Sequence, residues 1–318
     1  GIGAHYGVNG ANLSRQYKEI FSDYRDWKQL SHAEEYILYP QNIGPNLAID
    51  ESSLSCGELY TFVTNRDAHG GKGALVAAIR GTRAETVISV LEKIPAARRK
   101  TVREITLDLS SSMMLIAGRS FPKATLTNDR FHVHKLYYDA IDELRVSLRW
   151  MARDFENAEI DRCRKERIPY VPFRYANGDT RKQLLARAKY IFTRHASRWT
   201  KSQQWRADII FEFYPELKKA YDLAMELTDI FNQKVDKDVA RLNLARWYDK
   251  VDRMGTGQFR TVTETFRHHY DTILNYFINR STNAGAESFN AKVKAFRSQL
   301  RGVTDIPFFL FRLSKLCA

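Results

Sequence analysis

The chain has 318 residues, 44% of them hydrophobic and 12% aromatic, which is enough to bury a substantial core and excludes a disordered protein. Its formal net charge of +13 indicates a polyanion as the partner. The absence of a long apolar run and of closely spaced cysteines excludes a membrane span, a disulfide framework and a structural zinc site.

We expect the first 45 residues to be mostly helical. The chain starts with Gly1 instead of Met, which predicts a fragment or a processed chain. Its first residues lack the basic end and apolar core of a signal peptide, so we expect a cytoplasmic protein that is associated with the nucleoid. A turn at residues 7–10 precedes a helix that begins near Asn12, a pattern typical of a helix-turn-helix, here cut short. A second helical stretch is predicted over 23–39, before prolines break the pattern.

Short apolar runs then predict three consecutive strands, at residues 46–51, 59–64 and 74–79. A glycine-rich turn joins the last two as a hairpin, which implies an antiparallel meander. Helical spacing over 83–94 is followed by a fourth strand over 102–107. Because helical crossovers join parallel strands, we expect the fourth strand beside the first and parallel to it. Asp50 and Asp108, at the ends of these strands, would then face each other.

Another acidic residue follows the next predicted strand. Residues 124–127 form a short strand that leads to Asp129 and then to His132, three residues into the next helix. Two acids and a histidine are therefore expected at the ends of neighbouring strands. The alternative is structural, since Asp108 and Ser110 also suit one helix N-cap and Asp129 the next.

Beyond Asp129 the pattern is almost wholly helical. We predict an α/β fold with flanking helices, in which the stretch over residues 144–279 is all helical and basic. Residues 280–318 follow this helical stretch. In that last part a polar loop runs into a helix, with Glu287 in its first turn and Asn290 and Lys294 on the same or an adjacent face.

The positive charge is concentrated in one part of this predicted helical stretch. Residues 162–206 contain thirteen Lys and Arg against two acids, a net charge of +11. This concentration favours a phosphate-binding face on nucleic acid over a solvated helical face. Trp residues there would stack on an unpaired base, or pack in a core as Trp at helical spacing does. The residues expected to contact DNA are Arg162, Arg164, Lys165, Arg167, Arg181, Lys182, Arg187, Arg194, Arg198, Trp199, Trp205, Asn290 and Lys294.

Acids at the ends of two strands and on a late helix suit two-metal phosphoryl chemistry. Clustered carboxylates repel one another unless a divalent cation neutralises them, and two such ions stabilise both the attacking and the leaving oxygen of a displacement. Oxygen ligands favour Mg²⁺ or Mn²⁺.

Several motifs carry a resemblance to a known family. They are Ala48-Ile-Asp-Glu, Thr106-Leu-Asp-Leu-Ser, Phe121-Pro-Lys-Ala, Asp129-Arg-Phe-His-Val-His-Lys and Asn283-Ala-Gly-Ala-Glu-Ser-Phe-Asn-Ala-Lys-Val-Lys. In this order the set resembles the DDE transposases of bacterial insertion sequences, in particular the ISL3 group, from about Asn46 to the end of the chain. The family normally carries DNA-binding elements ahead of the core, often with a zinc module, whereas this chain has no cysteine cluster.

The resemblance implies an RNase H-like catalytic core over residues 46–143, completed by residues 280–318, with the helical stretch over 144–279 as an insertion before Glu287. It also implies a two-metal site with Mg²⁺ or Mn²⁺. Asp50 would bridge both ions, while Asp108 and Glu287 would each hold one. Asp129 and His132 match an Asp-x-x-His signature, in which His132 either positions the scissile phosphate or orients Asp129. The partners would be transposon-end DNA and target DNA, bound by a homo-oligomer, with no membrane.

Three functions remain open on the sequence. The first is metal-dependent DNA cleavage followed by strand transfer at insertion-sequence ends. The second is a catalytically inactive DNA-binding remnant of a transposase. The third is a nuclease or junction resolvase on the same core, which cleaves but does not join.

Overall fold

The computed structural model describes residues 5–55, 57–299 and 303–318. The chain forms two compact units, one made of Gly1–Asp129 with Arg280–Ala318 and the other of Arg130–Asn279. The chain therefore leaves the first unit after Asp129 and returns to it at Arg280. The boundary expected at residue 143 lies inside a helix of the second unit, α6 (Arg130–Glu166), and the division into functional domains stays a prediction.

A six-stranded mixed sheet forms the centre of the first unit. Its strands are β1 (Tyr36–Leu38), β2 (Asn46–Ser55), β3 (Glu58–Asn65), β4 (Leu75–Arg80), β5 (Glu104–Leu107) and β6 (Thr125–Asn128). Their spatial order is β1-β4-β3-β2-β5-β6. The four strands from β1 to β2 pair antiparallel, whereas β2, β5 and β6 are parallel. The predicted meander and the predicted parallel pairing of the first and fourth strands are confirmed.

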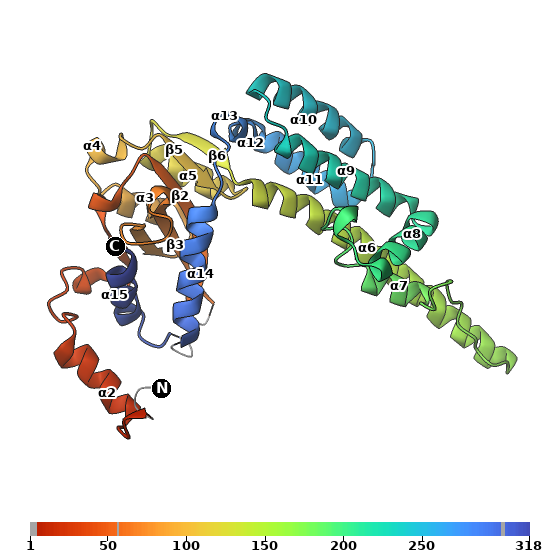
Figure 1. Ribbon diagram of the computed structural model, residues 1–318, viewed down its shortest axis with the longest axis horizontal. Helices are drawn as coiled ribbons and strands as arrows, with labels where there is room; N and C mark the ends of the chain where they lie inside the picture. The colour runs from red at the N-terminus through yellow and green to blue at the C-terminus, as the bar shows by residue number, and fades with distance from the viewer. Residues whose placement is uncertain (1–4, 56, 300–302) are drawn as a thin grey trace. The chain divides into compact units, whose positions relative to one another are not determined.

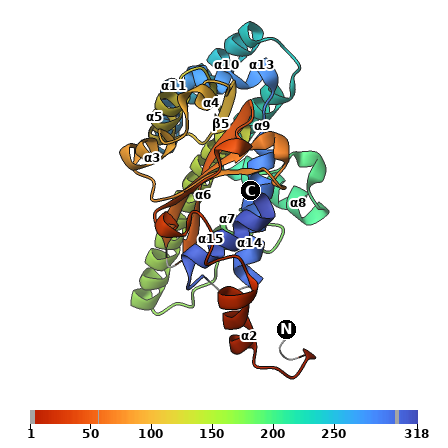
Figure 2. The same ribbon diagram turned by 90° about the vertical axis from the view of Figure 1, so that its left-hand side faces the viewer.

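Helices cover both faces of this sheet. They are α3 (Ala84–Leu91), α4 (Ala96–Arg99), α5 (Ser111–Ser120), α14 (Ala284–Gln299) and α15 (Ile306–Cys317). Because side chains alternate along a strand, Val63 packs with α3 and α5 on one face and Phe62 packs with α14 and α15 on the other. The C-terminal helices α14 and α15 lie together beside the sheet in both views (Figures 1 and 2). Strands that are buried on both faces explain why β4 is almost entirely apolar.

The N-terminal segment differs from the sequence expectation. It contains α2 (Gly10–Gln16), a π-helical turn (Tyr17–Phe21), and 3₁₀ turns at Leu30–His32 and Pro40–Asn42. The helix predicted over 23–39 is wrong, because β1 lies within this stretch and pairs with β4. Ile37 is fully buried in that pairing, so a tertiary partner decides the conformation of a short segment with weak local preference. Residues 1–4, which precede the turn predicted at residues 7–10, lie outside the described residues.

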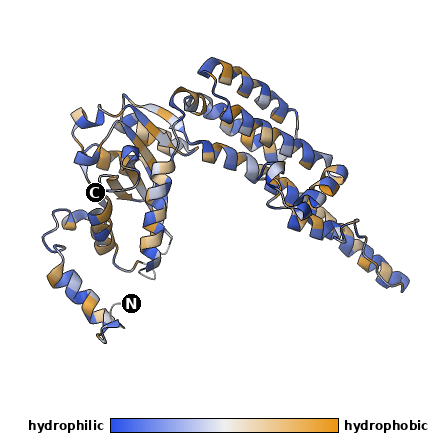
Figure 3. Ribbon diagram, in the orientation of Figure 1, coloured by the Kyte–Doolittle hydropathy of each residue, from blue (hydrophilic) through white to orange (hydrophobic). Residues whose placement is uncertain are grey.

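The second unit is helical throughout its regular structure. Its elements are α6 (Arg130–Glu166), α7 (Arg181–Arg187), the 3₁₀ turn Ala196–Arg198, α8 (Lys201–Phe213), α9 (Pro215–Asn232), α10 (Lys237–Asp252), α11 (Gly257–His268), α12 (Tyr270–Leu274) and α13 (Tyr276–Asn279). Hydrophobic and hydrophilic residues alternate along these helices (Figure 3), as expected for helices that bury one face. Trp247 lies fully buried against Tyr137 and Phe266. The regular structure of residues 144–279 is helical, as predicted, and residues 167–180 connect α6 to α7 without helix.

A helix of 37 residues, α6 (Arg130–Glu166), contributes to the packing of three other helices of the second unit, α7, α9 and α11. At 1.5 Å of rise per residue it is about 55 Å long. Within the described ranges, no helix is long and apolar enough to cross a membrane, and α6 itself carries many charged residues.

Candidate active site

Three aspartates lie where the parallel pairing of three adjacent strands ends. Asp108 and Asp129 directly follow β5 and β6, whereas Asp50 lies inside β2, which is longer than predicted and continues to Ser55 in its pairing with β3. The register pairs Ile49 of β2 with Leu107 of β5, and Leu107 with Asn128 of β6. One residue further along each strand are Asp50, Asp108 and Asp129. Since neighbouring strands are about 4.8 Å apart, the register places these three residues in one row across the sheet edge.

The electrostatics of Glu51 independently indicate that carboxylates gather here. Burial raises the pKa of the Glu51 carboxyl, and the negative charges of Asp108 and Asp50 raise it further. Glu51 is only partly exposed, as are Asp50 and Asp108. Like charges that oppose one another's ionisation are a typical environment for a bound cation. The sequence pattern did not single out Glu51, although it directly follows Asp50 within β2.

Helix α14 supplies the third expected acid from a distant part of the chain. The Asn290 side-chain amide donates a hydrogen bond to Oδ2 of Asp50, so α14 contacts β2 directly where the pairing of β2 with β5 ends. Glu287 is in the first turn of α14, three residues before Asn290 and thus on an adjacent part of the same helix face. The Glu287 side chain is exposed. The tertiary structure therefore brings α14 to the row of aspartates, and Glu287 lies on the solvent-exposed side of this helix.

The donors at this edge suit a hard divalent cation. Asp50, Asp108 and Glu51 provide carboxylate oxygens whose mutual repulsion a cation would relieve. Among the described residues, however, no three His, Cys, Asp or Glu side chains are already arranged to hold a metal ion. Glu287 in particular does not form such a group with Asp50 and Asp108. The residues present thus fit an oxygen-ligated metal site whose complete ligand set is not preassembled.

Asp129 is placed differently from Asp50 and Asp108. It is only 3% exposed, and its backbone N–H donates to the Leu107 carbonyl at 3.0 Å. Its negative charge is also close enough to the Arg66 guanidinium to raise the pKa of Arg66, against the stronger effect of burial. Asp129 therefore sits within the protein rather than at the open end of the row. His132 lies in the first turn of α6 and belongs to the second unit.

Several predicted DNA-binding cations of the second unit are partly engaged with acids. Arg162 pairs with Glu159 at 2.8 Å and with Glu166 at 3.2 Å, and Arg164 pairs with Asp161. These acids reduce the positive charge available on that part of α6. Exposed side chains remain in the same segment at Lys165, Arg167, Lys189, Arg194, Arg198 and Lys201.

Two further basic residues of this segment stabilise the fold. Arg187 pairs with Asp179, and Nε of Arg206 lies 3.1 Å from the other oxygen of the same carboxylate. Asp179 is only 2% exposed, so these cations compensate a buried charge. The sequence did not distinguish such residues from exposed ones because charge alone does not reveal a buried partner.

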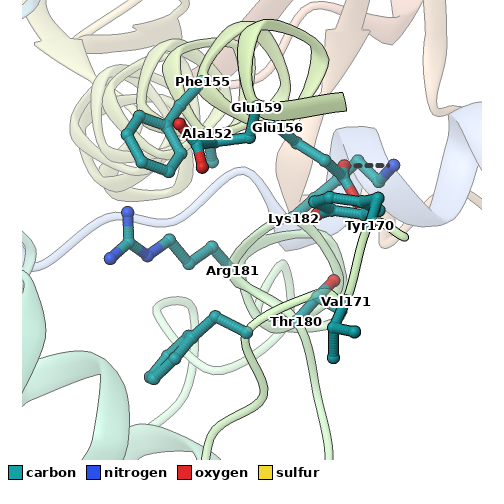
Figure 4. A pocket seen from close by; sticks show the side chains of 10 residues that line it. Ala152, Phe155, Glu156, Glu159, Tyr170, Val171, Thr180, Arg181 and Lys182 are labelled. Carbon is teal, nitrogen blue, oxygen red and sulfur yellow. Dashed lines mark ion pairs between the residues drawn. The ribbon is translucent and has the colours of Figure 1, made fainter. Parts of the chain in front are cut away.

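A cavity of about 270 Å³ lies beside α7 in the second unit. Its lining includes Arg181 and Lys182, and Figure 4 shows the ion pair between Lys182 and Glu156. The Arg181 guanidinium lies 5.0 Å from the ring centre of Phe155, a cation–π distance. Arg181 is exposed and is therefore accessible to DNA. Contact of Arg181 and Lys182 with DNA stays a prediction.

The two tryptophans of the basic segment have different environments. The Trp199 indole N–H donates to the Ile191 carbonyl at 3.1 Å, and its ring packs near Phe211 and Tyr221. Trp205 is 52% exposed. The packing at Trp199 supports the core alternative for that residue, and base stacking is better suited to Trp205. Of the residues on α14, Asn290 is directed to Asp50, while Lys294 is exposed.

The sheet order and its row of strand-end acids define the first unit as an RNase H-like α/β domain. The ISL3 transposase family model, described as a transposase, matches residues 47–313, which include both parts of the sheet unit and the helices between them. The chain belongs to this ISL3 group of DDE transposases. No curated protein and no solved structure gives a significant match to it.

Proposed function

We propose that this transposase cleaves DNA at the ends of an insertion sequence and joins the freed ends to target DNA, using divalent metal ions. One observation carries the proposal: the parallel register of β2 and β5 brings Asp50 and Asp108 level, and Asn290 of α14 is hydrogen-bonded to Asp50. Family membership supports the same activity. The edge of the sheet thereby combines acids from two strands with a helix that carries a third.

The residues around the row of aspartates would have different roles in this reaction. Two divalent ions, Mg²⁺ or Mn²⁺, would supply charge stabilisation at the attacking and leaving oxygens of an in-line phosphoryl displacement. Asp50, Asp108 and Glu287 would hold these ions. The Asn290 amide fixes the orientation of the Asp50 carboxylate by donating to its Oδ2. Asp129 would support the row from its buried position, and His132 would orient the phosphate or the neighbouring strand.

The basic segment would supply the nonspecific part of DNA affinity. Its exposed Lys and Arg side chains suit the phosphate backbone, whose binding releases counterions and depends steeply on salt. Transposon ends and target DNA are the proposed partners, and we expect a homo-oligomer on DNA. Size-exclusion chromatography with and without DNA tests the oligomer, and a monomer under both conditions contradicts it.

The test is cleavage and strand transfer on a labelled DNA that carries the element's ends, with Mg²⁺ and with EDTA. We expect cleaved and joined products only with metal, and neither product from Asp108→Asn. Cleavage without joining under conditions that supply target DNA would instead identify a nuclease or resolvase. Binding without any cleavage would identify an inactive DNA-binding remnant.

A further inference from the structure

Asp108 and Glu287 come from segments that are distant in sequence and need a device to align them. Between them the chain forms the whole second unit and then re-enters the first unit at Arg280. Catalytic ligands must be held to within about 0.5 Å to be effective. The way in which residues 281–283 attach to the sheet therefore controls where the first turn of α14 begins.

A polar row on one face of β5 makes this attachment. Glu104, Thr106 and Asp108 alternate along the chain and so project to the same face of the strand. Glu104 is 4% exposed and Thr106 is fully buried, although the interior of a parallel sheet normally selects apolar residues. Buried polar groups on such a strand are costly unless they are paired, so their partners indicate what the row is for.

The partners of this row are successive residues of the re-entering chain. The Ser281 hydroxyl donates to Oε2 of Glu104 at 2.7 Å. The Thr106 hydroxyl donates to Oδ1 of Asn283 at 2.9 Å, and Asn283 is only 2% exposed. The Asn283 carbonyl in turn accepts from the Glu287 backbone N–H at 2.8 Å, which starts the first turn of α14. Residues two apart on β5, Glu104 and Thr106, thus bind residues two apart on the entering chain, Ser281 and Asn283.

Arg66 joins this row to a loop that contacts α14. Its Nη2 donates to the Ser281 hydroxyl at 3.1 Å and lies 3.6 Å from Oε2 of Glu104. The Arg66 side chain is only 12% exposed, and burial lowers its pKa while Glu104, first among its neighbouring acids, opposes the shift. The buried guanidinium and the buried carboxylate stabilise each other in this position, because burying either charge without the other would cost much free energy.

The loop from Arg66 to Gly71, between β3 and β4, approaches α14 at backbone distance. A Cβ placed on Gly285 would lie 3.0 Å from the Arg66 carbonyl oxygen and 3.2 Å from its Cα. A Cβ on Gly70 would lie 2.9 Å from the Phe289 nitrogen, and Lys292 Nζ donates to the Gly70 carbonyl at 2.6 Å. The loop therefore contacts successive turns of the helix that carries Glu287.

We infer that Arg66, the polar row of Glu104 and Thr106, and the 66–71 loop form a positioning device that fixes the first turn of α14, which carries Glu287, relative to β5. These residues are positioning residues, since they act on Glu287 through the backbone of the entering chain. The inference deepens the proposed function and rests on it for the role of Glu287 as a metal ligand. The position of the first turn of α14 can be tested in the absence of metal.

Matched pairs of substitutions in the full chain separate positioning from general stability. Gly285→Ala inserts a methyl group against the Arg66 backbone, whereas Gly118→Ala adds one to α5 with no described atom within 4 Å. Thr106→Val removes the hydroxyl that binds Asn283. Thr64→Val is its control, since Thr64 is a buried threonine of β3 whose hydroxyl has no hydrogen-bond partner within the described parts of the chain.

The first readout is hydrogen exchange of a peptide spanning 280–290, without metal. We expect at least tenfold faster exchange in Gly285→Ala and a smaller increase in Thr106→Val, with α15 and both controls unchanged. Unchanged exchange at 280–290 in both variants overturns the inference. Should Gly285→Ala fail to fold, Thr106→Val decides alone.

The second readout is Mn²⁺ affinity, measured by isothermal titration or paramagnetic resonance on the full chain. We expect Gly285→Ala and Glu287→Gln each to weaken Mn²⁺ binding at least tenfold, and Gly118→Ala to leave it unchanged. If the native chain binds no Mn²⁺ while exchange at 280–290 responds as expected, the proposed metal chemistry fails and the positioning of α14 stands. If Glu287→Gln weakens binding and Gly285→Ala does not, the positioning role is overturned.

Discussion

The sheet unit and the helical unit are organised by different kinds of contact. In the sheet unit, the acids at the strand ends and the helix that carries Glu287 meet only because strands and helices from both ends of the chain pack together. The helical unit is one continuous stretch, and many of its cations pair with acids three or four residues away, as Arg162 does with Glu159 and Glu166. The proposed catalytic site depends on long-range packing, whereas a basic surface needs mainly local sequence. The two units should therefore fail in different ways.

The largest expected effect is the loss of chemistry in the sheet unit. Asp108→Asn should reduce DNA cleavage by at least about 10³-fold, because it removes a charged ligand of the proposed metal site. DNA affinity, measured by gel shift, should stay close to that of the native chain, since the basic segment is in the other unit. Glu92→Gln, at an exposed acid after α3, is the control and should cleave normally. Equal activity of the two variants would contradict the site.

The next effect concerns the core of the helical unit. Trp247→Ala should lower the free energy of unfolding by about 3–5 kcal/mol, because the ring is fully buried and its N–H donates to the Leu223 carbonyl at 2.8 Å. Chemical denaturation followed by circular dichroism measures it. Trp150→Ala, at a side chain that is 52% exposed in the same unit, should change it far less. A similar loss in both variants would show that burial does not decide stability here.

A moderate effect is expected on DNA binding. Replacing Lys165, Arg167 and Lys189 by Gln should weaken binding for all DNA sequences, because these exposed cations suit phosphate contacts. Each phosphate that is no longer neutralised should reduce the slope of log affinity against log salt by about 0.9. Lys218→Gln is the control, since Lys218 already pairs with Asp222 at 2.6 Å. An unchanged salt slope in the triple variant would place the DNA on another surface.

The smallest expected effect is a pH dependence of the helical unit. Burial, and next the neighbouring His268, lower the pKa of His269 below its ordinary value of 6.5. The unfolded chain then binds a proton more readily, so this contribution to stability is present above about pH 6.5 and is lost as pH falls towards the lower folded-state pKa. His269→Gln should flatten the dependence in denaturation measured at pH 7.5 and 5.5. The same change at exposed His195 should leave the slope as it is.

Local pattern was enough for much of the secondary structure. The strand that begins at Asn46, the strand before Asp108, the parallel pairing between them and the helical stretch after Asp129 follow from alternation, turn residues and the handedness of crossovers. The first of these strands continues past Asp50 to Ser55, because β3 provides an antiparallel partner that the local pattern did not reveal. The strand at Tyr36–Leu38 did not follow, because three residues carry little intrinsic preference and β4 provides the partner. Its aromatic, apolar character suited a helix equally well.

The sequence by itself determined the acids, their order along the chain, the basic segment and the family motifs, because these are properties of residue type and spacing. Only the tertiary structure decided that Asn290 contacts Asp50, that Glu51 shares the carboxylate environment, and that Arg187 is committed to buried Asp179. It also decided the contact between Thr106 and Asn283. Such contacts join residues that are distant in sequence, and their energies depend on burial and partner geometry, which no local pattern encodes.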